Sequence, residues 1–199
     1  MGIRKIISEE ERERVKKRNI RAMSIILAAI MLFSSLGYFA NDLFTTKENS
    51  ITYNGLKFIQ TDYGTWTFLA GGKNFETKFN PEQTKTVSVI LTKNLQSYYN
   101  QPLYFGVDSA SEISSLGNAE VARNLQEFVT KSQLSCITAN CSEDYPIKNC
   151  SANSVIIFKS SALNITRVSE ENNCVVIQYA PGNEELVADA FLFKIFGIN

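Results

Sequence analysis

The four cysteines, Cys136, Cys141, Cys150 and Cys174, are the residues whose type and spacing point most directly to chemistry. Four, eight and 23 residues separate them in turn, unlike the close pairs of zinc knuckles and thiol oxidoreductases. An even number of cysteines confined to one region is typical of disulfides formed outside the cytosol. Three connectivities are possible. We favour Cys136–Cys141 with Cys150–Cys174, because the second bridge would fix the segment 131–153, expected to be irregular, to the last strands. Metal-bound or free thiols are the alternative.

Histidine is absent from the 199-residue chain, and this limits the chemistry available. Imidazole-dependent triads and H-E-x-x-H metal sites are excluded. The chain also lacks a phosphate-binding glycine loop, a G-x-S-x-G elbow and an acidic cluster with calcium spacing. A Ser–Lys dyad is the remaining enzymatic alternative. We predict no catalytic residue, no cofactor and no metal site, and the net charge of zero predicts no nucleic-acid partner.

Three N-x-S/T sequons lie in the same region of the chain as the cysteines. Their asparagines, Asn140, Asn149 and Asn164, are candidates for N-glycosylation. Asn164 is the best of the three because it is not next to a cysteine and is expected in a long connection between strands. Chance alone would give about three sequons in a chain this rich in Asn, Ser and Thr.

Two further groups of side chains have a structural and a functional interpretation. Glu184, Glu185 and Asp189 are expected to form the start and the solvated face of a helix. Four aromatic residues are expected mainly in the core, although they would also suit a sugar or peptide groove: Tyr98, Tyr99, Tyr104 and Phe105.

Residues 22–40 contain nineteen positions without a charge. As a helix they would extend about 28 Å, close to the thickness of the bilayer hydrocarbon core. Residues 1–21 carry a net charge of +4 and the remainder −4, so the positive-inside rule places residues 1–21 in the cytoplasm and residues 41–199 outside. We therefore predict a single-pass transmembrane helix at 22–40.

Two other interpretations of this segment exist. A buried core helix would normally show a polar stripe, which is missing between Met23 and Phe33. A cleavable signal peptide fits the small residues Ser35 and Gly37. Against cleavage, Ser8 and Glu11 form a capping box, and acidic residues precede basic ones as the dipole of a preformed charged helix at 1–21 favours.

A linker at 41–50 is expected to lead into one extracytoplasmic domain at 51–199. Turn signals such as Asn54-Gly55 and alternating polarity predict a β-meander that is followed by mixed strands and helices, an α+β fold. A strand–helix–strand order between 103 and 158 allows one parallel pair. The expected strands are 51–53, 56–60, 65–69, 75–79, 87–91, 103–107, 154–158 and 174–179, and the expected helices are 120–130 and 183–196.

The order of several short motifs resembles uncharacterised single-pass membrane proteins of archaeal genomes. The motifs are Tyr53-Asn54-Gly55-Leu56-Lys57-Phe58, Trp66 in a hairpin, Phe79-Asn80-Pro81, Cys150 before Val155-Ile156-Ile157-Phe158, Asn172-Asn173-Cys174-Val175-Val176-Ile177, and the closing segment 188–198. The resemblance covers most of the outer domain and implies an archaeal cell-surface setting, in which disulfides and N-glycans are both plausible. That group has no assigned activity, so the resemblance transfers no functional residues.

Together these features predict a non-catalytic binding or structural module of the cell envelope, anchored in the cell membrane with its N-terminus in the cytoplasm. Its expected partners are the lipid bilayer and a membrane or envelope protein. The alternative is an accessory subunit of a membrane complex for export, folding or glycosylation, for which Ala28, Ala29 and Ser34 would allow close helix packing.

Overall fold

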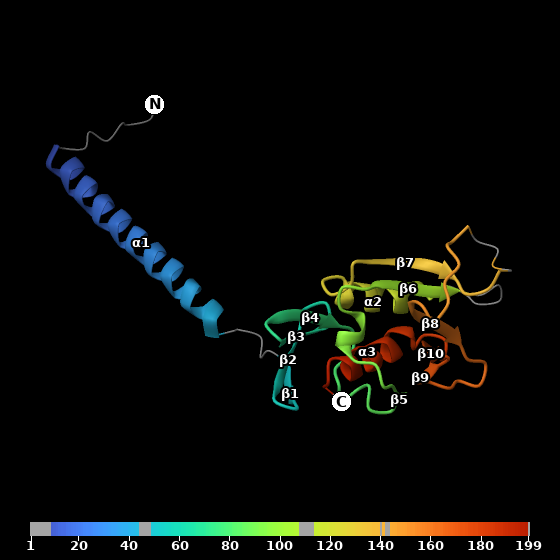
Figure 1. Ribbon diagram of the computed structural model, residues 1–199. Coiled ribbons are helices and arrows are strands. Elements are labelled where there is room, and N and C mark those ends of the chain that lie inside the picture. The colour runs from blue at the N-terminus through green and yellow to red at the C-terminus, as the bar shows by residue number, and fades with distance from the viewer. Residues whose placement is uncertain (1–8, 44–48, 108–113, 140, 142–143, 199) are drawn as a thin grey trace. The chain divides into compact units, whose positions relative to one another are not determined.

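The computed structural model describes residues 9–43, 49–107, 114–139, 141 and 144–198, with backbone alone for 9, 11 and 32–43 (Figure 1). The chain divides into two compact units, residues 1–48 and 49–199. The capping residue Ser8, residues 44–48 of the predicted linker and the sequon residue Asn140 lie outside the described residues.

The first unit contains one long helix, α1, which runs from Glu9 to Leu43. It includes residues 9–21 of the charged segment and the whole uncharged segment 22–40 without a break. In the part of the chain whose side chains are described, no helix is long and apolar enough to cross a membrane. The side chains of residues 32–40, which belong to the predicted span, lie outside that part.

The second unit begins with a four-stranded antiparallel meander in the order β1-β2-β3-β4. Its strands are β1 Ser50–Tyr53, β2 Leu56–Gln60, β3 Trp66–Ala70 and β4 Lys73–Thr77. Asn54 and Gly55 both have positive φ, as the tight turn predicted for this dipeptide requires. Gly71 and Gly72 make a second such turn, so β4 begins at Lys73, two residues before the expected strand 75–79.

A six-stranded mixed sheet follows, in the order β5-β9-β10-β8-β6-β7. Strands β7, β6, β8 and β10 are parallel to one another, β9 is antiparallel to β10, and β5 is parallel to β9. The strands are β5 Ser88–Ile90, β6 Pro102–Val107, β7 Lys131–Cys136, β8 Ser154–Ser160, β9 Arg167–Glu171 and β10 Cys174–Tyr179. The α+β class is confirmed, and the sheet has more parallel pairs than the single one expected.

Two of these strands were not expected from the sequence. β7 lies within the segment predicted to be irregular, and β9 lies within the predicted long connection before β10. β7 is an edge strand, and β9 pairs on one side with the short β5. Neither is buried along its whole length, so polar side chains interrupt the apolar pattern by which strands are recognised.

Two α-helices belong to the second unit: α2, Ser115–Leu125, and α3, Glu184–Ile195. A short 3-10 helix, η1, covers Leu95–Tyr98. The hydroxyl of Ser114 accepts a hydrogen bond from the Gly117 N–H, and this cap starts α2 five residues before the expected helix 120–130. The helix predicted at 183–196 agrees with α3 to within one residue at each end.

The helices α2 and α3 pack together and lie between the meander and one face of the six-stranded sheet (Figure 1). Phe193 of α3 contacts the rings of Phe58 and Phe68 in the meander. Ile156 of β8 and Val175 of β10 belong to the same apolar cluster. Because α3 has apolar neighbours on opposite sides, it is apolar nearly all round and almost wholly buried.

The other face of the sheet carries a much smaller cluster. Its buried members are Tyr104, Val155, Ile157, Cys174 and Val176. Ile137 and Cys150, which come from the segment after β7, pack against them. This face is therefore covered by an irregular segment rather than by a helix.

Candidate functional site

A polar cavity of about 580 Å³ opens at one end of the six-stranded sheet. Its lining comes from the connection between β5 and β6, from residues 151–154 before β8, and from the β9–β10 hairpin. The parallel strands β6, β8 and β10 begin at this end, whereas β5 and β9 finish there. Hydroxyl and amide side chains dominate the lining, among them Gln96, Ser97, Ser151, Asn153 and Asn173.

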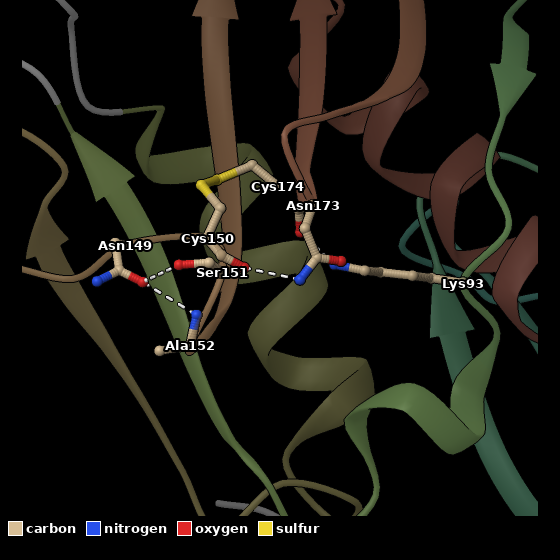
Figure 2. Close-up of a disulfide and its surroundings, with 7 residues drawn as sticks. All are labelled: Lys93, Asn149, Cys150, Ser151, Ala152, Asn173 and Cys174. Atoms are coloured by element: carbon tan, nitrogen blue, oxygen red, sulfur yellow. Dashed lines mark hydrogen bonds between the residues drawn. A yellow bond between two sulfur atoms is a disulfide. The ribbon is translucent and has the colours of Figure 1, made fainter.

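A disulfide fixes two walls of the cavity to each other (Figure 2). Cys150, just before the segment 151–154, is bonded to Cys174 at the start of β10. The Asn173 side-chain amide donates a hydrogen bond of 2.8 Å to the Cys150 carbonyl oxygen. Positive φ at Asn172 and Asn173 makes the two-residue turn between β9 and β10, so this turn and the segment after Cys150 are held together by covalent and polar bonds.

The segment after Cys150 is also shaped by its own hydrogen bonds. Asn149 Oδ1 accepts from the Ser151 hydroxyl and from the Ala152 N–H, both at 2.9 Å (Figure 2). The Asn149 side chain thus replaces a backbone acceptor for the N–H three residues further on, as a helix N-cap does. The wall formed by residues 151–154 is therefore organised before any ligand enters.

The two charged residues in the lining, Lys93 and Glu170, have opposite signs. The Lys93 ammonium donates to the Asn173 carbonyl oxygen (Figure 2). Partial burial lowers the pKa of this lysine, and the negative charge of Glu170 offsets only part of that decrease. Glu170 Oε2 accepts from the Thr92 hydroxyl at 2.6 Å and from the Thr92 N–H at 3.1 Å. These bonds lower the pKa of Glu170, so its carboxylate stays ionised.

The four aromatic residues considered for a groove separate into two groups. Tyr98, Tyr104 and Phe105 are buried in the apolar clusters, so the groove interpretation is wrong for them. Burial, with a smaller contribution from the Glu170 charge, raises the pKa of Tyr98. Tyr99 lines the cavity and is 49% exposed. Of the four, only Tyr99 has its ring available at this site.

The cysteines and sequon asparagines that the sequence singled out lie in different places. The structure pairs Cys136 with Cys141 and Cys150 with Cys174, the connectivity favoured from the sequence. Asn149 is exposed at the edge of the cavity wall, and Asn164 is exposed with positive φ in the β8–β9 connection. Of the cysteines and sequon asparagines that the structure describes, those near the cavity are the Cys150–Cys174 pair and Asn149.

A pair of carboxyl groups is buried between α2 and α3. Asp189 is fully buried and Glu120 is 3% exposed, so the prediction of a solvated face was wrong for Asp189. Glu184 and Glu185, by contrast, lie in the first turn of α3 and are partly exposed. The meander covers this side of α3, and the sequence of α3 alone does not reveal that cover.

The polar partners of these two carboxyl groups come from several elements. Asp189 Oδ2 accepts from the Phe79 N–H at 2.8 Å. Glu120 Oε2 accepts from Arg123 at 2.6 Å, and the two carboxyl groups hydrogen-bond each other. Burial, then the Glu120 charge, raises the pKa of Asp189 well above its ordinary value, and burial also raises that of Glu120. We infer that Asp189 holds a proton and shares it with Glu120 by donating it in their hydrogen bond.

The polar cavity has the chemistry of a binding site. It offers many groups that both donate and accept hydrogen bonds, a carboxylate held ionised, and an ammonium already bonded to the protein. Among the described residues, no three His, Cys, Asp or Glu side chains gather as metal ligands do. Two other cavities, of about 240 and 300 Å³, lie beside α2.

Sequence reasoning missed most of this cavity. Lys93, Glu170 and Asn173 belong to no recognisable motif, and the structure brings them together from the β5–β6 connection and the β9–β10 hairpin. One local signal existed. The Asn172-Asn173 dipeptide stands directly before the apolar run 174–177, and asparagine is typical of tight turns. This turn would have identified β9 and the position of Asn173.

No protein-family model, no curated protein and no solved structure matches this chain.

Proposed function

We propose that the chain is a membrane-anchored, extracytoplasmic binding module of the cell envelope that performs no catalysis. The observation that carries this proposal is the presence of two disulfides in the unit 49–199, because such bonds persist in oxidising compartments. The uncharged segment 22–40, preceded by a net charge of +4, supplies the anchor and its orientation. The cell surface of an archaeon is the setting that we propose with it.

The polar cavity supports the binding part of this proposal. Its walls are fixed by a disulfide and by hydrogen bonds within the chain, and such preorganisation lowers the entropic cost of binding. The same bond that indicates the compartment therefore also shapes the cavity. N-glycans at Asn149 or Asn164 would suit this location, because both asparagines are exposed.

Protease access in sealed, right-side-out vesicles tests the topology. We expect added protease to digest the domain after residue 48 and to leave the segment before residue 40 intact. In vesicles opened with detergent, protease should digest both parts of the chain. Alkylation should label none of the four cysteines until a reductant is added. Recovery of intact chain from the cytosol, with every cysteine alkylated without reductant, would overturn the proposal.

Purification in a mild detergent distinguishes this module from an accessory subunit of an export, folding or glycosylation complex. A free or self-associated chain agrees with the envelope module. A stable partner in fixed stoichiometry favours the subunit, in which the anchor would make lateral contacts through small residues such as Ala28 and Ala29.

A further inference from the structure

The cavity beside the Cys150–Cys174 disulfide has a size and a construction that suit a small molecule. Its volume of about 580 Å³ lies within the range of about 300–1,000 Å³ that ligand pockets occupy. Asn173 joins its walls, since its amide donates to Cys150 and its carbonyl accepts from Lys93 (Figure 2). A ligand would therefore meet a surface that needs little rearrangement.

The charges in the cavity do not favour a strongly charged ligand. Lys93 and Glu170 oppose each other, and the Lys93 ammonium is already bonded to a backbone carbonyl. A phosphate would be attracted by Lys93 but repelled by the ionised Glu170, and a cation would experience the reverse, so the pair gives no net attraction to an ion of either sign. A neutral ligand avoids both penalties.

The hydrogen-bonding groups in the cavity match a ligand rich in hydroxyls. The hydroxyls of Ser97 and Ser151 and the amides of Gln96 and Asn153 each provide donor and acceptor capacity. Glu170 accepts from Thr92 through Oε2 and from the Lys93 N–H. A carboxylate has about four lone-pair sites, so capacity remains to accept from a ligand hydroxyl. A saccharide offers hydroxyls that donate and accept in the same way.

Tyr99 provides the remaining element of such a site. Its half-exposed ring lines the cavity, and an aromatic ring combines an apolar face with a polar edge. The C–H face of a pyranose packs against such a ring while its hydroxyls reach polar walls.

We propose that this cavity binds a neutral saccharide. The inference deepens the binding function proposed above, and it rests on that function for the oxidising compartment in which the Cys150–Cys174 bond forms. Free sugars, envelope polysaccharides and protein-linked glycans share the chemistry that the cavity recognises.

Saturation-transfer NMR on the full chain in phospholipid nanodiscs tests the proposal. The chain is purified without maltoside or glucoside detergents, which would compete for the cavity. The probes are glucose, galactose, mannose, N-acetylglucosamine, cellobiose and maltose at millimolar concentration. We expect transfer to at least one probe and a loss of at least about fivefold in Tyr99→Ala and in Glu170→Gln, since each removes a contact with the ligand.

Tyr63→Ala is the matched control, because Tyr63 is 90% exposed in the β2–β3 turn and is not in the cavity lining. Binding should persist in this variant. Emission from Trp66, the only tryptophan, verifies that every variant is folded. Absence of transfer to all six sugars, or equal transfer in wild type, Tyr99→Ala and Glu170→Gln, would overturn the saccharide site.

The two proposals fail in different ways. A chain that spans the membrane with both cystines formed but binds none of the sugars contradicts only the saccharide site. A chain found in the cytosol with reduced cysteines that still binds a sugar through Tyr99 and Glu170 contradicts only the envelope location.

Discussion

The two faces of the six-stranded sheet are covered by different means. On one face, α2 and α3 contribute to a large apolar cluster that continues into the meander. On the other face, five buried residues form a small cluster, and the Cys150–Cys174 bond attaches the covering segment. We expect hydrophobic burial to stabilise the first face and loss of chain entropy in the unfolded state to stabilise the second.

Phe193→Ala should give the largest loss of stability, on the helix-covered face. Phe193 is fully buried and contacts two phenylalanines of the meander, so the cavity left behind should cost about 3–5 kcal/mol. Urea unfolding followed by Trp66 emission measures this change, because the only tryptophan lies in β3. Tyr63→Ala at an exposed position is the control. A loss equal to that of the control would show that α3 is not a central layer.

Removal of the Cys150–Cys174 bond should give the next largest loss, on the opposite face. The double substitution Cys150→Ala and Cys174→Ala removes a cross-link between residues 24 positions apart. For a loop of this length we expect the free energy of unfolding to fall by about 3 kcal/mol. The matched variant, Cys136→Ala with Cys141→Ala, opens a separation of five residues and should cost about 2 kcal/mol. The reverse order in urea unfolding would contradict an entropic origin.

Gly117→Ala tests how closely α2 approaches the sheet. A methyl group at this position would lie 2.8 Å from Phe158 Cδ1 and closer still to Cε1, and the Phe158 ring is buried. Alanine normally favours a helix relative to glycine, yet here we expect destabilisation by about 1–3 kcal/mol from overpacking. Ser115→Ala, at an exposed position of the same helix, is the control. A gain in the urea midpoint of Gly117→Ala would show that the helix can move away.

The buried carboxyl pair should make the helix-covered face sensitive to pH. The pKa of Asp189 is raised by burial and by the Glu120 charge, so the folded protein binds this proton more tightly than the unfolded chain does. Stability from the pair is therefore complete below the ordinary carboxyl pKa near 4, and it is lost as pH rises through the raised value. The charged groups facing Asp189 and Glu120 are Arg123 and Glu185. The neutral donors are the Phe79 N–H and the Asn124 side-chain amide.

Asp189→Asn tests this effect, the smallest of the four at any single pH. The amide keeps an acceptor for the Phe79 N–H and a donor for Glu120, so we expect a weaker fall in the urea midpoint between pH 4 and pH 8 than in the wild type. Glu184→Gln, a partly exposed position in the first turn of α3, should leave the wild-type dependence in place. An unchanged pH dependence in Asp189→Asn would refute a shared proton.

The meander and α3 were predictable because their signals are local. Turn dipeptides such as Asn54-Gly55 fix hairpins through the φ values that they permit, and a run of apolar residues identified α3. The start of α2 was missed because a single hydroxyl, that of Ser114, sets it. β9 was missed because its pairing with β10 depends on a turn of two asparagines in a polar stretch.

The sequence alone determined the α+β class, the uncharged segment and the favoured pairing of the cysteines, since all three depend on composition and on separation along the chain. Tertiary structure decided which polar groups meet. It buried Asp189 against Glu120 because the meander covers α3. It gathered Lys93, Glu170 and Asn173 around one cavity because strands distant in sequence become neighbours in the sheet. Such contacts depend on strand order, which no local pattern encodes.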